Sequence, residues 1–379
     1  MKKIDTLIIR DHSIITGKKN LEDLLILKDF PVFFGCVDTP ASEDLVADMK
    51  WAIDPETGVI QLTDLIPLEV LYQEQHVDGF GKTWEEYYSY FSEYIAKTNP
   101  KNVLEIGGGI GVVAEKVVGM TDSTTWTILE PNPLRENSDR IKVMPGFFDS
   151  NFKATEHYDT ITFSQVMEHV YEPHTFLKDI SSFMQAGDKF VFAYPNLKLW
   201  LERKFTNALN FEHTMFFTDY FIDILLPQYN FKVTDKFFYN DHSVLYTAEK
   251  TDTPIDIPDL ENKYEEYKKI FTEFVEYHTE LVVNLNKKMA TSTVPTYFFG
   301  AHIFASYLFA FGLDKSKITA ILDNSSLKKG RRFYGTDFIV QSPESLRDKG
   351  QVNVILKASL YNDEIKEQIL SINSKVIFW

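Results

Sequence analysis

The sequence predicts an α/β protein with a mostly parallel central sheet, a small β-rich module before it and a second α/β domain after it. Three features predict this fold. A short apolar run, Val103–Ile106, is followed by four glycines in five positions and then by apolar residues at helical spacing. A second apolar run ends in the acidic residue Glu130. The order of apolar run, glycine and helix returns around Gly300.

The composition is typical of a folded protein with no nucleic-acid partner. A chain of 379 residues predicts two or three domains. Its 39 basic and 55 acidic residues give a net charge of −16, which argues against a nucleic-acid partner, because binding to nucleic acid needs a basic face. The single cysteine, Cys36, excludes an internal disulfide and a multi-thiolate zinc site. Since no apolar run is long enough to span a membrane and no signal-peptide pattern is present, we expect a cytoplasmic protein.

Four segments follow one another along the chain. Residues 1–66 alternate short apolar runs with turns, which predicts the β-rich module. Residues 67–250 contain the glycine turn and form the predicted core. Residues 251–290 begin with a proline-containing acidic linker and continue as a long helix with an apolar stripe. Residues 291–379 repeat the strand, glycine turn and helix, and form the second domain.

The glycine turn predicts a ligand site, because glycine lets the backbone approach a ligand closely and the next helix presents free N–H groups. Two patterns fit. Gly109–Ala114 matches the dinucleotide fingerprint G-x-G-x-x-A. Glu105–Gly111 resembles the E-x-G-x-G-x-G signature of class I S-adenosylmethionine (SAM) methyltransferases. The carboxylate of Glu105 would repel a pyrophosphate but not a cationic sulfonium. SAM is therefore the predicted ligand, held by Glu105, Gly107, Gly109 and Gly111.

A second segment strengthens this resemblance. Tyr158–Pro173 is similar to the fourth-strand region of class I methyltransferases, D-x-I-x-x-x-x-V-L-E-H-V-x-x-P. Both segments occur in the expected order, and the resemblance implies a Rossmann-like core. It also implies that Ser164 and Gln165 lie beside the cofactor, and that Phe148 stacks on the adenine with Asp149 at its exocyclic amine. A buried phenylalanine pair is an equal alternative for Phe148.

The acidic end of the second strand predicts the ribose contact. Glu130 would accept hydrogen bonds from both ribose hydroxyls. The alternative is a carboxylate that caps a helix N-terminus.

The segment Asn210–Thr218 resembles the E-H-x-x-x-F-[ST] motif of bacterial nucleotide-sugar C-methyltransferases. Glu212 would orient a substrate hydroxyl, and His213 would accept its proton, because histidine is poised for this work near neutral pH. His169 is the second choice for the base. The segment before the first strand would close the site with Tyr72 and His76, or be a surface loop. In the relatives a tyrosine stands where this chain has Asn210, which puts carbon methylation in doubt.

The two outer segments also resemble those relatives. Their N-terminal module holds zinc in C-x-x-C-G turns, whereas the turns here are Ser13-x-x-Thr16-Gly17 and Asp54-x-x-Thr57-Gly58. Hydroxyl groups do not form a zinc site, so we predict a metal-free version. Their C-terminal domain forms one wall of the sugar-nucleotide cleft. Here it carries a basic cluster that could meet a diphosphate or be a solvated turn, namely Lys328, Lys329, Arg331 and Arg332.

These features together predict a methyltransferase that uses SAM, releases S-adenosylhomocysteine and needs no metal. The resemblance implies a nucleotide-linked sugar, or a similar small anionic metabolite, as the acceptor and a role in carbohydrate biosynthesis. We expect no nucleic-acid or membrane partner. Three alternatives stay open: an O- or N-methyltransferase of another small molecule, an NAD-linked oxidoreductase that uses Gly109–Ala114, and a binding protein with an inactive site.

Overall fold

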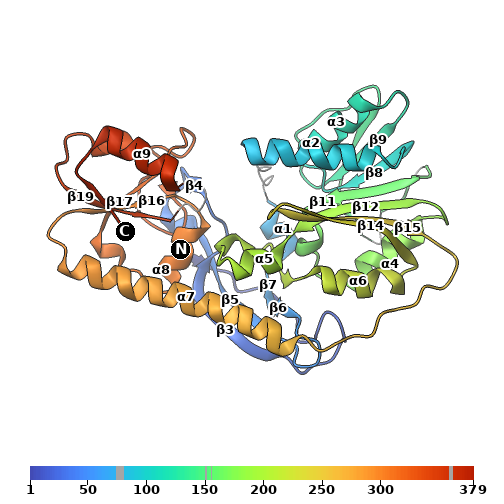
Figure 1. Ribbon diagram of the computed structural model, residues 1–379, viewed down its shortest axis with the longest axis horizontal. Coiled ribbons are helices and arrows are strands. Elements are labelled where there is room, and N and C mark those ends of the chain that lie inside the picture. The colour runs from blue at the N-terminus through green and yellow to red at the C-terminus, as the bar shows by residue number, and fades with distance from the viewer. Residues whose placement is uncertain (74–80, 150–151, 155, 358–361) are drawn as a thin grey trace.

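The computed structural model describes residues 1–73, 81–149, 152–154, 156–357 and 362–379. The N-terminal module lies in the middle of the molecule, between the larger central domain and the smaller C-terminal domain (Figure 1). A long helix, α7 (Tyr264–Thr291), runs along the module and leads into the C-terminal domain. Within these described ranges, no helix combines the length and apolarity needed to cross a membrane.

The central sheet has the strand order β10-β9-β8-β11-β12-β15-β14. The parallel strands are β8 (Asn102–Ile106), β9 (Thr125–Glu130), β10 (Ile141–Pro145), β11 (Thr160–Ser164) and β12 (Lys189–Pro195). Two antiparallel strands, β14 (Phe231–Tyr239) and β15 (Ser243–Lys250), complete one edge. The order reverses between β8 and β11, which is where open parallel sheets bind ligands. This arrangement confirms the predicted α/β fold.

Helices cover both faces of the central sheet (Figure 1). One face carries α2 (Lys82–Ala96) and α3 (Val112–Met120). The other carries α4 (Pro173–Phe183) and α6 (Asp219–Gln228). Two short helices, α1 (Leu68–Leu71) and α5 (Leu197–Glu202), lie near the carboxyl ends of the strands. Because helices cover both faces, β8, β9, β11 and β12 are buried over almost their whole length, whereas the edge strand β10 is only partly buried.

The N-terminal module takes strands from both of its neighbours. Its main sheet has the order β1-β5-β6-β13, with β3 paired to β5, and β13 comes from the central domain. In the same way, β4 pairs with β18 of the C-terminal domain. One hydrophobic cluster joins the module to the central domain, so packing crosses the predicted boundary at residue 66. The strands concerned are β1 (Lys2–Lys3), β2 (Ile8–Ile9), β3 (Glu22–Pro31), β4 (Cys36–Val37), β5 (Leu45–Ile53), β6 (Ile60–Leu62), β7 (Asp64–Leu65), β13 (Met215–Phe216) and β18 (Arg332–Phe333).

The two similar turns of the module meet around one carboxylate. Oδ2 of Asp54 accepts hydrogen bonds from the hydroxyls of Ser13 at 2.6 Å and Thr57 at 2.9 Å. The Thr16 hydroxyl lies 3.4 Å from the same oxygen. Ser13, Asp54 and Thr57 are buried. The side chains of Ser13, Thr16 and Thr57 are thus joined through Asp54 by hydrogen bonds. We call this group the hydroxyl cluster.

The C-terminal domain has a parallel sheet of strand order β17-β16-β19-β20. Its strands are β16 (Thr296–Phe299), β17 (Ile318–Leu322), β19 (Val352–Leu356) and β20 (Val376–Phe378), and its helices are α8 (Ile303–Ala310) and α9 (Asn362–Ile372). The strand and helix order is the one that the sequence predicts for this domain.

The basic cluster of the C-terminal domain is largely paired with carboxylates. The guanidinium of Arg332 is buried and binds both oxygens of Asp44 at 2.6 Å, which fastens this domain to the N-terminal module. Lys328 contacts Asp323 at 2.9 Å, and Arg331 contacts Asp38 at 3.0 Å. Three of the four predicted basic residues are therefore already paired with carboxylates within the protein, which weakens the case for a diphosphate role. The cluster is mainly a structural joint.

We predict that Asp54→Ala lowers the free energy of unfolding by about 3 kcal/mol, because it leaves buried hydroxyl groups without their shared acceptor. Thermal and urea unfolding followed by circular dichroism measure this. The matched control is Asp38→Ala, which removes an exposed carboxylate and should change stability by no more than about 0.5 kcal/mol. A zinc ion whose removal lowers the unfolding temperature of the wild type, but not of Asp54→Ala, would contradict the metal-free reading of the hydroxyl cluster.

Candidate active site

The glycine turn between β8 and α3 has a backbone that only glycine adopts easily. Gly107, Gly109 and Gly111 have positive φ angles of 68°, 54° and 80°. A Cβ atom at Gly107 would lie 2.9 Å from a methyl group of Val166, and one at Gly111 would lie 2.8 Å from Cδ of Arg135. Neighbouring side chains therefore pack closely against this turn. The turn lies where the strand order of the sheet reverses.

Two carboxylates flank this turn. Glu105 is buried, and its Oε2 accepts a 2.8 Å hydrogen bond from the indole N–H of Trp126. The Glu130 carboxylate accepts the backbone N–H of Gly109 at 3.1 Å and that of Asn132 at 3.2 Å. Glu105 thus lies on the side of the turn that faces Trp126, whereas the carboxylate of Glu130 binds the backbone of the turn itself at Gly109. These positions are compatible with the predicted roles of both residues toward the cofactor.

Tyr72 connects the glycine-turn side of the site with a histidine cluster. Its backbone oxygen accepts a 2.6 Å hydrogen bond from the amide of Asn132, next to Glu130. Its hydroxyl lies 2.8 Å from Nδ1 of His169. His169 ends the short 3₁₀ helix η2 (Met167–His169), directly after β11. A chain of hydrogen bonds therefore links the predicted cofactor end to the predicted catalytic end.

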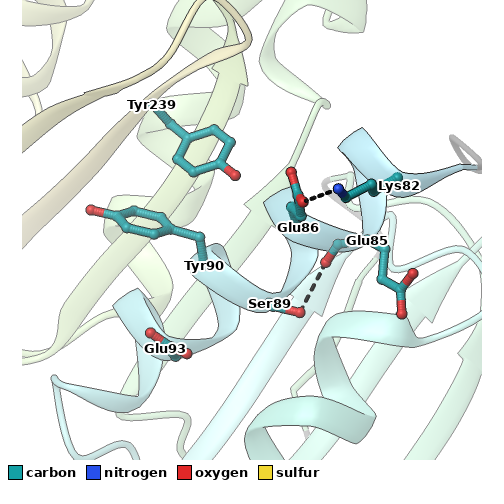
Figure 2. Close-up of a pocket in the computed structure, with 7 residues that line it drawn as sticks. All are labelled: Lys82, Glu85, Glu86, Ser89, Tyr90, Glu93 and Tyr239. Carbon is teal, nitrogen blue, oxygen red and sulfur yellow. Dashed lines mark hydrogen bonds and ion pairs between the residues drawn. The ribbon is translucent and has the colours of Figure 1, made fainter.

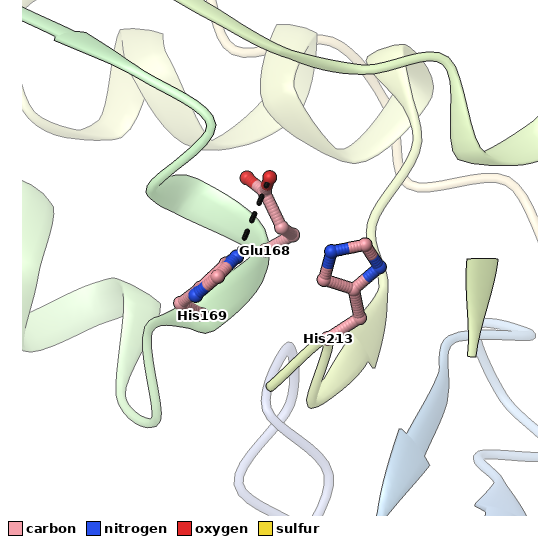
Figure 3. A group of neighbouring side chains, drawn as sticks. All are labelled: Glu168, His169 and His213. Carbon is pink, nitrogen blue, oxygen red and sulfur yellow. Dashed lines mark ion pairs between the residues drawn. The ribbon is translucent and has the colours of Figure 1, made fainter. Parts of the chain in front are cut away.

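Glu168, His169 and His213 form the centre of the histidine cluster (Figure 3). The two imidazole rings have their centroids 5.3 Å apart. Nε2 of His169 lies 3.7 Å from Oε1 of Glu168. One potential ligand atom from each of the three residues lies within 4.8 Å of the others. Residues 44 positions apart in sequence, 169 and 213, are thus brought into contact distance.

Burial shifts the pKa values of Glu168 and His213. The Glu168 side chain is 1% exposed, and in the described part of the chain neither of its oxygens has a hydrogen-bond partner. Desolvation, with a smaller effect of the nearby charge of Glu212, raises the pKa of Glu168 to about 8. Desolvation also lowers the pKa of His213. Nδ1 of His213 lies 3.3 Å from the backbone oxygen of Ala208. A neutral imidazole that donates there keeps its lone pair on Nε2.

Asn210 shapes the loop that carries Glu212 and His213. Its side-chain oxygen accepts the backbone N–H groups of Glu212 at 2.8 Å and of His213 at 2.9 Å. This is the local turn that asparagine forms most readily. Asn210 therefore has a structural role in this chain.

The same loop is anchored to the N-terminal module by a residue that the sequence did not single out. The buried guanidinium of Arg10 donates to the backbone oxygens of Thr214 at 2.6 Å, of Tyr171 at 3.0 Å and of Leu62 at 3.0 Å. The N–H of Thr214 donates to the backbone oxygen of Glu168 at 3.0 Å. Because every acceptor of Arg10 is a main-chain atom, no local sequence signal could have revealed it.

Ser164 and Gln165 lie at the carboxyl end of β11, as predicted. The hydroxyl of Ser164 is 2.6 Å from that of Tyr87 on α2. Gln165 has a positive φ of 56°, and its amide donates to the hydroxyl of Ser243 at 2.9 Å. Strained backbone of this kind gathers at functional sites. Tyr87, which is fully buried, is a second residue that the sequence analysis missed.

The two phenylalanines after β10, Phe147 and Phe148, have different surroundings: Phe148 packs in the core and Phe147 lies next to Tyr72. The Phe148 ring packs against those of Phe152, Phe176 and Phe183 at centroid distances of 5.5–5.8 Å. This packing favours the structural alternative for Phe148 over stacking on the adenine. Phe147 is partly exposed, and its ring lies edge-on to that of Tyr72. Asp149 is exposed beside it. The predicted residue His76 lies outside the described residues.

A surface hollow on the outer side of α2 is separate from this site (Figure 2). Three glutamates and two tyrosines dominate its lining, which consists of Lys82, Glu85, Glu86, Ser89, Tyr90, Glu93 and Tyr239. Lys82 pairs with Glu86 across one turn of the helix. The hollow contains no predicted site residue.

Part of the chain is similar to known proteins. Residues 76–236 match the family model described as a methyltransferase domain. No curated protein matches the chain. The chain is similar to human N-acetylserotonin methyltransferase in complex with SAM (14% identity, 45% of this chain, 53% of that chain, TM-score 0.38). It is also similar to an O-methyltransferase family protein from Burkholderia thailandensis (11%, 45% and 57%, 0.37). A third similar structure is N-methyltransferase NodS from Bradyrhizobium japonicum WM9 (14%, 44% and 96%, 0.33).

The chain spans about half the length of the first two of these proteins. Residues 76–236 are therefore similar to methyltransferase domains, and their central sheet carries a glycine turn flanked by two carboxylates at its switch point.

Proposed function

We propose that this enzyme transfers the methyl group of SAM to a small anionic acceptor, most specifically a nucleotide-linked sugar, with His213 as the general base. One observation carries the proposal. A chain of contacts runs from Glu130 through Asn132 and Tyr72 to His169, and so joins the cofactor end to the histidine cluster. A methyl donor at the glycine turn and an acceptor at the histidines would then meet in one enclosed site.

The reaction that this site supports is an in-line displacement at the sulfonium methyl. The bond from methyl carbon to sulfur breaks as the acceptor atom bonds to that carbon, and S-adenosylhomocysteine leaves. The protein mainly aligns the two reactants. Nε2 of His213 takes the proton of the acceptor, and the lowered pKa of His213 keeps the imidazole neutral and ready to accept it. Glu212 would hold an acceptor hydroxyl, and His169 is the second candidate for the base.

A second candidate keeps the cofactor and changes the acceptor to the oxygen or nitrogen of another small molecule. The turn-forming role of Asn210 favours it, because no tyrosine stands at that position for carbon methylation. The paired state of Lys328, Arg331 and Arg332 also favours it, because a diphosphate would find few uncompensated charges there. NMR of the product separates methyl groups on carbon, oxygen and nitrogen.

We predict that Glu130→Ala weakens SAM binding by roughly 30-fold, the equivalent of about 2 kcal/mol, through loss of hydrogen bonds to a charged acceptor. Isothermal titration calorimetry with SAM and with S-adenosylhomocysteine measures this. Glu136→Ala removes an exposed carboxylate of the same loop and should leave the affinity unchanged. Thermal stabilisation of the wild type by NAD but not by SAM would overturn the cofactor assignment.

We predict that His213→Ala lowers turnover by about 10²- to 10⁴-fold, since a positioned base contributes this much, while SAM affinity stays near that of the wild type. The assay offers ¹³C-methyl SAM with a panel of nucleotide-linked sugars, and NMR detects the labelled product. His157→Ala, which removes an exposed histidine, serves as the control. Full turnover by His213→Ala would exclude His213 from the mechanism.

A further inference from the structure

The histidine cluster contains a buried carboxylate, Glu168, that proton transfer by His213 does not require. Glu168 carries two carboxylate oxygens that lack hydrogen-bond partners in the described part of the chain, although the side chain is 1% exposed. Burying a carboxylate without partners costs several kcal/mol, so the group either takes up a proton or is stabilised by a cation or a set of donors. Nε2 of His169 lies 3.7 Å from Oε1 of Glu168, and a ring nitrogen of His213 lies within 4.8 Å of the carboxylate. Glu168 is therefore aimed at two imidazoles.

Both imidazoles are held from their far side. Nδ1 of His169 is 2.8 Å from the Tyr72 hydroxyl, and Nδ1 of His213 is 3.3 Å from the Ala208 backbone oxygen. In each ring the other nitrogen is turned toward Glu168 (Figure 3). Histidines that bind metals in proteins are oriented in this way, by a hydrogen bond from the nitrogen that does not bind the metal. The cluster thus has donor atoms at its centre and orienting groups behind them.

The donor set determines which cation would fit. Two imidazole nitrogens and one carboxylate oxygen favour zinc-like divalent ions over magnesium or calcium, which prefer oxygen ligands. Donors around a tetrahedral zinc ion stand about 3.4 Å apart, given bond lengths near 2.1 Å. The three ligand atoms lie within 4.8 Å of one another, so small side-chain rotations would bring them to that separation. Three protein ligands would leave a fourth position for water or an acceptor atom.

We propose that Glu168, His169 and His213 form a binding site for one divalent transition-metal cation, and that occupancy of this site stops methyl transfer. The second part rests on the proposed function: the cation takes the Nε2 lone pair of His213, which the base needs to accept a proton. Methyl transfer itself requires no metal in this account. The cation is an inhibitor that competes with the acceptor proton for the same nitrogen.

The binding test uses the untagged full-length protein, stripped with EDTA and dialysed. Co²⁺ is added stepwise while the visible absorption of nitrogen- and oxygen-bound cobalt is recorded, and Zn²⁺ binding is measured by calorimetry. We expect one equivalent to bind, and Glu168→Gln to weaken binding by more than about tenfold. The control is His12→Ala, since His12 lies beside Asp11 and Glu172 at the surface and offers a competing cation site. It should bind as the wild type does.

Equal binding by the wild type and Glu168→Gln, or loss of binding in His12→Ala, would overturn the site. Because Glu168→Gln could fail to fold, X-ray absorption at the zinc edge is recorded for the wild type as well. Two imidazoles in the zinc coordination shell support the proposal, and fewer than two contradict it.

The two proposals fail in different ways. SAM calorimetry on the metal-free protein tests the cofactor alone, so SAM binding without any Co²⁺ binding leaves the proposed function intact and removes the metal site. Where the acceptor panel gives a product, the Zn²⁺ concentration that halves turnover should match the dissociation constant from calorimetry. Full turnover at saturating Zn²⁺ would overturn the inhibitory role.

Discussion

The buried guanidinium of Arg10 donates hydrogen bonds to three main-chain oxygens. These bonds hold the loop that carries Glu212 and His213 in place. They join Leu62 of the N-terminal module, Tyr171 after η2 and Thr214 beside His213. Burial lowers the pKa of Arg10 to about 10, which still leaves it charged at neutral pH. A buried charge that is hydrogen-bonded to these three oxygens opposes movement of the segments that carry them. The relative position of Glu168 and His213 depends on this anchor.

This anchor gives the N-terminal module a role that does not require a metal. The module supplies β6, on which β13 of the central domain is paired directly after the Glu212–His213 loop. The hydroxyl cluster around Asp54 closes the turns that precede β6. Hydrogen bonds thus close these turns, and the module presents β6 as the pairing partner of β13. The packing of the N-terminal module against the central domain therefore also determines the geometry of the site.

Local sequence patterns were sufficient for the framework of the molecule. Apolar runs and glycines predicted the strands, the turn and the position of Glu130, because these depend on backbone and burial alone. The same patterns did not predict the roles of Arg10 and Tyr87, because the hydrogen-bond partners of these residues are distant in sequence. The pattern after β10 did not separate the core ring of Phe148 from the exposed ring of Phe147. A charge run likewise could not reveal that Arg332 faces Asp44, 288 residues away.

The central claim is that the glycine turn holds the methyl donor with its sulfur directed toward the histidine cluster. A crystal structure of the full chain with S-adenosylhomocysteine tests this most directly. The account predicts ribose hydroxyls on Glu130 and a sulfur that faces Nε2 of His213 across the space of one acceptor atom. A ligand that is absent from the glycine turn at saturating concentration, or a sulfur that points away from Glu168 and His213, would contradict it.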